Sequence, residues 1–346
     1  MLRFLTVFGW LVANVLADPQ LNPPPPAAAP AQIPKADGPS IVAYSQNPAA
    51  MNHDQEDPVV TRSMVDALVR TLAGQADSAA AWRSIAGPED RVGIKVCSAG
   101  GPLFATRRGV VMAIIAGLRS AGVKTIIVWD KDPAAMRTAG FTTEALGCEV
   151  RAIDPPKGWD RTAVISSPVL GRVIWGDLRF SSIARDRSAD PLSPESHLPT
   201  LLTRDLTKFI NAAALSDDPG TGVGGAMHSA VIGNVDNWRR FTGEGAALLP
   251  DIYSDARLGG KCALHILDAL NVTYAGGPAA NPYHSAAHCT LYASRDPIAL
   301  DATGLRLLEK WRAAEKLGPI GPKAAWLGDS SIGHADEKMI QFKPAR

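Results

Sequence analysis

The feature that most constrains the fold is a regular alternation of short apolar runs with one amphipathic stretch. Val92–Cys97 and Thr125–Trp129 are apolar runs, the second rich in β-branched residues. Between them, residues 106–122 carry apolar side chains at helical spacing, with Thr106 as the expected N-terminal cap. A third strand is expected at Glu149–Ile153. This order of strands and helices predicts an α/β fold with a mostly parallel sheet and flanking helices.

The second half of the chain continues this pattern. Lys208–Leu215, Ala263–Leu267 and Cys289–Ala293 are expected to be strands. Pro297–Leu317 is expected to be a long helix, because Asp296 can cap it and a proline occupies its first turn.

One antiparallel hairpin is expected as an insertion in this sheet. Gly176-Asp177 lies between two apolar runs, which is a hairpin signal. The chain has 346 residues, of which 46% are hydrophobic, and this is enough to bury a core without disulfides or metals. We therefore expect residues 40–346 to form a single α/β domain.

The N-terminal residues have the pattern of an export signal. Arg3 precedes the apolar run Phe4–Ala17, which ends in small residues and is shorter than the ~20 residues that a membrane span needs. We expect residues 1–17 to be a cleaved signal peptide, with an uncleaved anchor as the alternative. The mature protein would then be periplasmic or secreted, without stable membrane insertion. Asp18–Pro39 is rich in proline and alanine, which favours an extended linker.

Charge and cysteine content argue against two classes of protein. Without residues 1–17, which contain one basic residue and no acid, the chain has 34 basic and 34 acidic residues. This balance gives no basic surface for nucleic acid. None of the four cysteines belongs to a CxxC unit, so we expect no zinc ribbon and no iron–sulfur cluster. Export would permit a bridge between Cys262 and Cys289, and four buried thiols are the alternative.

Residues 216–237, SDDPGTGVGGAMHSAVIGNVDN, contain most of the polar residues that suggest a site. Gly220, Gly222 and Gly225 satisfy G-x-G-x-x-G, but the strand and acid of a dinucleotide fold do not follow at the right spacing. An anion at the N-terminus of a helix starting near Gly222, or a tight turn without a ligand, are the remaining interpretations. Gly222, Gly225 and Asn237 are the candidate substrate-binding residues of this segment.

Four acids end or follow expected strands: Asp130, Asp217, Asp218 and Asp268. Ligands of open α/β sheets collect at the carboxyl ends of strands, and carboxylates suit a divalent cation. Residues 216–237 contain no lysine or arginine, which favours a cation over a phosphate. We predict Asp217 and Asp218 as ligands of a divalent metal, and Asp268 as a substrate-binding residue. Helix or turn capping is the alternative for each.

Lys95 and His228 are the candidate catalytic residues. A lysine in an apolar strand needs a partner, since an unpaired buried charge is costly, and Lys95 is therefore predicted to bind an anionic substrate. The alternative is that its side chain extends outward to solvent from a sheet edge. His228 follows the glycines and is predicted to act as acid or base near neutral pH. His284 and His288 have the spacing of zinc ligands on a helix, but Pro282 argues against a helix there.

Three stretches of the chain resemble a bacterial family called domain of unknown function 362. They are VGIKVCSAGGPLFATRRGVVMAIIAGLRSAGVKTIIVWD, ALHILDALNVTYAGGPAANPYHSAAHCTLYASRDPIALDATG, and the glycine-rich segment between them. The resemblance covers roughly residues 90–340, with SRDPIALD as its most specific motif. It implies an α/β fold with a site at strand ends, and no assigned activity. The residues that match the family pattern are Lys95, Asp268, Asp296 and Asp301.

The glycine-rich segment departs from that family pattern. Ser216 and Asp218 stand where relatives have a lysine and a histidine, and His228 and Ser229 stand where relatives have a lysine and an asparagine. The resemblance therefore implies the loop geometry of the family without its cationic groups.

Two functions are compatible with these residues. The first is an exported, metal-assisted enzyme that acts on a small polar or anionic substrate, with Lys95 as anion binder and His228 as acid or base. The second is a non-catalytic protein that binds a small-molecule ligand in a diverged site.

Overall fold

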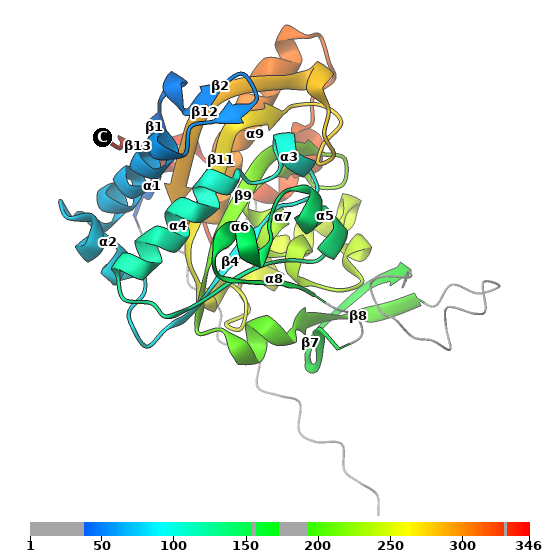
Figure 1. Cartoon of the computed structure of the whole chain (residues 1–346). Coiled ribbons are helices and arrows are strands. Elements are labelled where there is room, and N and C mark those ends of the chain that lie inside the picture. Colours follow the sequence, from blue (N-terminus) through cyan, green and yellow to red (C-terminus); the bar gives the residue numbers. More distant parts are fainter. Residues whose placement is uncertain (1–37, 154–156, 173–191, 329–330) are drawn as a thin grey trace, which may run out of the picture. The chain divides into compact units, whose positions relative to one another are not determined.

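The computed structural model describes residues 38–153, 157–172, 192–328 and 331–346, which form a mixed sheet with helices on both faces (Figure 1). The strand order is β13-β1-β12-β11-β9-β4-β5-β6, and β10 pairs with β9 beside this path. The predicted α/β fold with a mostly parallel sheet is confirmed. The strands are β1 (Ser40–Gln46), β4 (Arg91–Val96), β5 (Thr125–Asp130), β6 (Glu149–Ala152), β9 (Lys208–Asp218), β10 (Gly222–Gly224), β11 (Cys262–Thr273), β12 (Ser285–Ser294) and β13 (Ile340–Pro344).

The centre of the sheet is parallel. Strands β11, β9, β4, β5 and β6 all run in one direction, and β12 lies antiparallel between β11 and β1. The expected strands at Val92–Cys97, Thr125–Trp129 and Glu149–Ile153 agree with β4, β5 and β6 to within one residue at each end. Local sequence predicts them well because both faces of a central parallel strand are buried, which requires a continuous apolar run.

β9 and β11 are among the strands that are longer than predicted. β9 continues past Leu215 to Asp218, and β11 continues past Leu267 to Thr273. Pairing between strands accounts for both extensions, since β10 pairs with the end of β9 and β12 pairs along β11. The predicted strand-end acids Asp217 and Asp268 therefore lie inside strands, and Asp218 is the last residue of β9.

The sheet separates two sets of helices. One set packs with β1 and β12, and its apolar side chains share a core with Val92, Ile94 and Ile210. The other set packs against β9, β1 and β12 from the opposite face, over Phe209 and Leu267. The first set is α1 (Pro58–Ala73), α2 (Ser78–Ile85) and α4 (Arg108–Ser120), seen together in Figure 1, and the second is α7 (Ala226–Ala230), α8 (Leu249–Tyr253) and α9 (Pro297–Ala314).

Aspartates cap several of these helices. Asp57, Asp77 and Asp296 each accept hydrogen bonds from backbone N–H groups in the first turn of α1, α2 and α9. Such a side chain satisfies donors that a helix leaves without a partner. The prediction of Asp296 as the cap of α9 is confirmed, although this helix ends at Ala314 rather than Leu317.

The prediction of Thr106 as the cap of α4 is wrong. α4 begins at Arg108 with Arg107 in the cap position. The Thr106 hydroxyl instead lies between β4 and β9, where it accepts from Cys97 N at 3.0 Å and donates to Ala212 O at 2.6 Å. Because both hydrogen bonds of this hydroxyl are made to the strand segments, it does not cap the helix.

A separate two-stranded antiparallel ribbon consists of β7 (Trp159–Arg172) and β8 (Leu192–Pro199). The predicted hairpin turn at Gly176-Asp177 falls between these strands and outside the described residues. The remaining short elements are β2 (Met51–Asn52), β3 (Gln55–Glu56), α3 (Gly101–Phe104), α5 (Pro133–Thr138), α6 (Thr143–Leu146) and short segments of other helix types, including Leu201–Asp205, Ile232–Asn234, Trp238–Phe241 and Gly321–Leu327.

The predicted signal peptide, residues 1–17, and nearly all of the predicted linker lie outside the described residues. Within the described ranges, no helix is long and apolar enough to cross a membrane. All four cysteines are free, so Cys262 and Cys289 form no bridge.

Candidate functional site

A cavity opens where the connections of the parallel strands diverge. β4 is connected to β5 through α4 on one face, whereas β9 is connected to β11 through α7 and α8 on the other face. Open α/β sheets bind ligands at such a switch point, outside the carboxyl ends of the strands. We call this space, of about 780 Å³, the carboxyl-end cavity. Its lining includes Lys95, Cys97, Ser98, Asp130, Lys131, Asp218, His228, Ser229, Gly233, Trp238 and Arg239.

A buried ion pair forms part of the cavity wall. Lys95 is 1% exposed, and its Nζ donates to Asp130 Oδ1 and to Val96 O, both at 2.8 Å. Asp130 Oδ2 accepts from the N–H and the hydroxyl of Ser98 at 2.9 and 2.6 Å. Burial acts to raise the pKa of Asp130, but the Lys95 ammonium and these donors outweigh it and hold the pKa below its ordinary value. The Asp130 carboxylate therefore stays charged and holds the Lys95 side chain in the cavity wall.

Gly233 makes room for the end of the Lys95 side chain in the cavity wall. An ammonium has three N–H donors, and two of those of Lys95 have acceptors among the described residues. A Cβ at position 233 would lie 2.7 Å from Lys95 Cε and 2.8 Å from Nζ. The end of the lysine therefore occupies the space that a side chain at position 233 would need, and its third donor lines the cavity without an acceptor among the described residues.

His228, on α7, is the second ionisable group that lines the cavity. Its Nδ1 lies 3.3 Å from Thr221 Oγ1 and 3.8 Å from Asp218 Oδ2. The Thr221 hydroxyl has two acceptors for its hydrogen, Asp218 Oδ1 at 3.0 Å and Val223 O at 3.1 Å. Its oxygen is therefore left to accept from Nδ1–H of the histidine. We assign the tautomer with hydrogen on Nδ1 from this network, which leaves the lone pair on Nε2.

The surroundings of His228 favour its neutral form. Burial lowers the pKa of its imidazole, Asp218 opposes this effect, and the ammonium groups of Lys95 and Lys131 add to the decrease. A neutral imidazole with a free Nε2 lone pair can accept a proton. Asp218 then stabilises the imidazolium that forms.

A carboxylate from α9 holds the helix that carries His228. Asp301 is fully buried, and its two oxygens accept from Ala226 N at 2.5 Å and Met227 N at 2.9 Å. These are the first N–H groups of α7, which have no partner within the helix. Burial raises the pKa of Asp301 to about 7, against the effect of both amides. Asp301 thus fixes the start of α7 two residues before His228.

The predicted helix start near Gly222 is wrong. Residues 222–224 pair with β9 as β10, and α7 begins at Ala226. Gly225 has no room for a side chain, because a Cβ there would lie 2.3 Å from Asp301 Oδ1. The expected anion position at the helix start is therefore occupied by the protein's own carboxylate.

Cys97 and Ser229 form another part of the polar wall. Burial raises the pKa of the Cys97 thiol, and the neighbouring Lys95 opposes this only in part. Ser229 Oγ donates to Asn211 Oδ1 at 2.7 Å, deeper in the protein. A protonated thiol is a weak nucleophile, so the wall favours proton transfer by His228 over nucleophilic attack by Cys97.

One aromatic ring and two cationic side chains form the remaining wall of the cavity. The Arg239 guanidinium lies 4.5 Å from the centre of the Trp238 ring, and Lys131 Nζ lies 5.7 Å from the same centre. Such contacts attract cations to the ring face. A ligand in this cavity thus meets an apolar ring surface with positive charge beside it.

The structure separates the two predicted metal ligands. Neighbouring residues of a strand point to opposite faces. Asp217 accepts from Gly276 N and Gly277 N at 3.1 and 2.6 Å and lies 3.5 Å from Arg312, whereas Asp218 binds the turn at Thr221. Across the described residues, no three His, Cys, Asp or Glu side chains lie together as a ligand set for a metal ion. Metal binding by Asp217 and Asp218 stays a prediction.

The other predicted binding residues do not line the cavity. Asp268 accepts from Arg107 N at 2.7 Å, at the start of α4, and burial raises its pKa to about 6. Asn237 donates to Ser193 O and Glu195 O, both at 3.1 Å, and so holds β8. Gly222 has φ of +83°, and a Cβ there would lie 2.7 Å from Ala324 N. The structure therefore brings together Lys95, His228 and Asp218, and places Asp268, Asn237, Gly222, Gly225 and Asp217 elsewhere.

Sequence reasoning missed several residues of this site. The sequence gives no prediction for Thr221, Ser98 or Trp238, and it places Asp130 among the strand-end acids without a role as partner of Lys95. The position of Asp130 at the end of a strand beside Lys95 was an available signal, since neighbouring parallel strands end at the same edge. No local signal indicates Thr221, whose role depends on the fold of the turn.

Comparisons with known proteins add little about activity. No curated protein matches the chain. A solved structure of a protein from Thermotoga maritima is similar to it, with 10% sequence identity and a TM-score of 0.39. The match covers 77% of this chain and 61% of that one, so this chain spans less than two thirds of the length of that protein.

A family model described as "Domain of unknown function (DUF362)" matches residues 196–306. This segment contains Asp218, His228 and Asp301, whereas Lys95 and Asp130 precede it. The matched segment is shorter than the predicted range of residues 90–340, and over residues 196–306 the predicted resemblance to the DUF362 family is confirmed.

Proposed function

We propose that the protein is an enzyme that binds a small carboxylate or carbonyl compound in the carboxyl-end cavity and transfers a proton on it. One observation carries the proposal. The Lys95 ammonium and the His228 imidazole line the same cavity, and each keeps one group that can reach a ligand. A concave, largely apolar site with a few convergent polar groups is typical of small-molecule enzymes.

The two residues would have complementary roles. The third N–H of Lys95 would donate to the ligand oxygen, where negative charge develops. His228 Nε2 would accept the proton that leaves the neighbouring carbon, and the electron pair of that bond would move toward the oxygen held by Lys95. The resulting imidazolium would be stabilised by Asp218 and would return the proton in the reverse step.

Exchange of C–H hydrogen for deuterium tests this proposal directly. The full chain is incubated in D₂O with pyruvate, acetoacetate, malonate and succinate, and loss of each C–H signal is followed by NMR. We expect exchange of at least one compound above the buffer rate, and a loss of about a hundredfold or more in His228→Gln. His288→Gln is the matched control, because burial also lowers the pKa of His288 but this residue lies outside the cavity lining.

The same experiment separates catalysis from binding alone. A compound that raises the melting temperature of the parent without exchange above the His228→Gln rate would identify a binding protein and contradict the enzymatic role. Absence of both effects for all four compounds would contradict the proposed substrate class.

We also propose that the protein is exported. The support is the apolar run Phe4–Ala17 and the small residues at its end. Intact-mass analysis of protein recovered from a bacterial host should give a chain that begins at Asp18. A recovered chain that begins at Met1 would contradict export with cleavage.

A further inference from the structure

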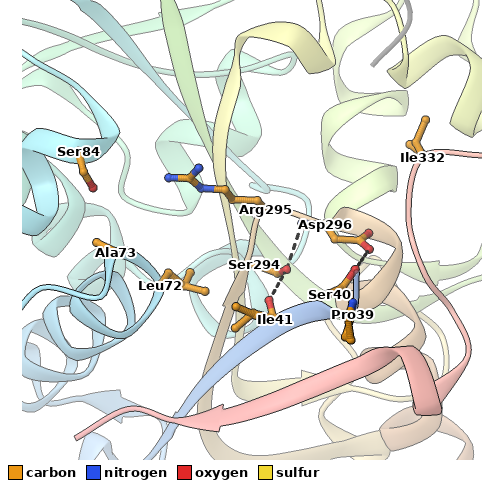
Figure 2. Close-up of a pocket in the computed structure, with 10 residues that line it drawn as sticks. All are labelled: Pro39, Ser40, Ile41, Leu72, Ala73, Ser84, Ser294, Arg295, Asp296 and Ile332. Atoms are coloured by element: carbon orange, nitrogen blue, oxygen red, sulfur yellow. Dashed lines mark hydrogen bonds between the residues drawn. The ribbon is translucent and has the colours of Figure 1, made fainter. Parts of the chain in front are cut away.

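A second cavity lies at the opposite end of the sheet (Figure 2). It has a volume of about 490 Å³ and is bounded by the start of β1, the end of β12, the end of α1, and α2. Strand β1 runs in the direction of the central parallel strands, because both β1 and β11 are antiparallel to β12. We therefore call this space the amino-end cavity. Its lining is Pro39, Ser40, Ile41, Leu72, Ala73, Ser84, Ser294, Arg295, Asp296 and Ile332.

The acid of this cavity is fully engaged by the protein. Asp296 Oδ1 accepts from Ile298 N and Ala299 N at 2.8 and 3.0 Å. Its Oδ2 accepts from His334 N at 2.8 Å and from the Ser40 hydroxyl. Four donors occupy the two oxygens, so this carboxylate has little capacity left to bind a ligand cation.

The arginine next to Asp296 is available to a ligand. Arg295 has no hydrogen-bond or ion-pair partner among the residues that the structure describes. Figure 2 shows its guanidinium directed away from Asp296, toward the side of the cavity where Ser84 lies. A guanidinium presents N–H donors in a planar fork that matches the two oxygens of a carboxylate.

The surroundings of Arg295 favour a singly charged anion over a phosphate. Asp296 is the next residue, and the C-terminal end of α1 contributes Leu72 and Ala73 to the lining. A carboxylate and the negative end of a helix dipole both repel a second negative charge. The lining also includes the apolar residues Ile41 and Ile332, beside the hydroxyl groups of Ser40, Ser84 and Ser294.

We propose that the amino-end cavity binds a monocarboxylate with a compact apolar body, with its carboxylate on Arg295. The apolar body lies against Ile41, Leu72, Ala73 and Ile332, where its burial adds to the binding free energy. This site does not depend on the function proposed for the carboxyl-end cavity.

Calorimetric titration of the full chain with benzoate tests the proposal. We expect benzoate binding to weaken about tenfold or more in Arg295→Gln, because a charge-assisted hydrogen-bond pair is lost. Arg295→Lys should restore part of the affinity, since it keeps the charge without the fork. Arg83→Gln, on α2 beside Ser84 but outside the lining, is the matched control and should bind like the parent.

A second variant tests the space rather than the charge. Ala73→Trp places a large side chain in the lining and leaves Arg295 in place, so it should remove the same binding phase. Lys95→Met should retain that phase, which keeps this result separate from the carboxyl-end cavity. Equal affinity for benzoate and benzamide, tighter binding of phenyl phosphate, or benzoate binding unchanged in both Arg295→Gln and Ala73→Trp would overturn the proposal.

Discussion

The two cavities lie at opposite ends of one sheet and hold their charged residues in different ways. In the carboxyl-end cavity, Lys95 is buried and paired with Asp130, and His228 is kept neutral. In the amino-end cavity, Arg295 is exposed and has no partner among the described residues, while the Asp296 carboxylate accepts hydrogen bonds from three backbone N–H groups. A buried ammonium needs a partner, whereas an exposed guanidinium does not. The carboxyl-end cavity therefore has the groups that proton transfer needs. The amino-end cavity has a fixed positive charge, which favours ligand binding without proton transfer.

One helix is linked to both cavities. α9 begins at the amino-end cavity, where Asp296 caps it, and Asp301 in its second turn holds the start of α7 at the other cavity. The SRDPIALD motif therefore contributes to both ends of the sheet. A substitution that alters one cavity and leaves ligand binding or exchange at the other unchanged would show that the two cavities act separately.

The largest expected effect comes from two matched buried aspartates. Asp301 holds α7, which carries His228, whereas Asp268 holds α4, which contributes no residue to the cavity lining. Replacing either with alanine leaves two buried N–H groups without acceptors, so each should lower the free energy of unfolding by about 2–4 kcal/mol. Urea unfolding measures this cost, and NMR titration measures the pKa of His228. Only Asp301→Ala should change that pKa; an equal change in Asp268→Ala would remove the distinction between the two acids.

These two aspartates also show what the sequence can predict. The strands β4, β5 and β6 follow from local apolar runs, and the capping of α9 by Asp296 follows from residues next to it. Asp301 and Ala226 are 75 positions apart, and Asp268 and Arg107 are 161 apart. No local pattern reports such contacts, because they exist only once distant segments pack together. The same holds for β9 and β11, whose true ends are set by their neighbours in the sheet.

The candidate site was predictable to the extent that it depends on strand ends. Lys95 and Asp218 were found because polar residues interrupt or follow apolar runs, and His228 because it follows the glycines. Asp217 and Asp218 have different partners in the structure, since β9 continues through both and neighbouring residues of a strand point to opposite faces. The strand pairing that carries β9 through these residues could not be predicted from the local sequence.

Gly233→Ala should disturb one cavity and spare the other. A Cβ at this position would lie 2.8 Å from Lys95 Nζ, which is held by Asp130, so the lysine must shift. We expect a loss of about 1–3 kcal/mol in unfolding free energy from overpacking, together with slower deuterium exchange. Benzoate binding through Arg295 should be unchanged. Gly260→Ala is the matched control, since a Cβ there meets Ala256 at an ordinary 3.5 Å; equal effects of both variants would contradict a specific role for Gly233.

The pH dependence of stability separates the same two aspartates. The pKa of Asp301 is raised from 3.8 to about 7 by burial, so between these values the folded chain binds more protons than the unfolded chain. Stability from the protonated form is therefore lost as the pH rises through this window. Because Asp301→Asn does not titrate, the parent's advantage over it should fall by at most about 1.4 kcal/mol per pH unit. For Asp268→Asn the fall should end near pH 6; a parent advantage that grows with pH would contradict the sign.

The smallest expected effect is on stability at the amino-end cavity. Arg295→Gln removes an exposed side chain that has no partner among the described residues, so the free energy of unfolding should change by less than about 0.5 kcal/mol. The neighbouring Asp296→Ala removes the acceptor of three backbone N–H groups and should cost well over the ~1 kcal/mol of a simple helix cap. Urea unfolding of both variants, beside deuterium exchange at the other cavity, measures the contrast. A destabilisation by Arg295→Gln comparable to that of Asp296→Ala would mean that the arginine is committed to the fold, and the difference drawn between the two cavities would then fail.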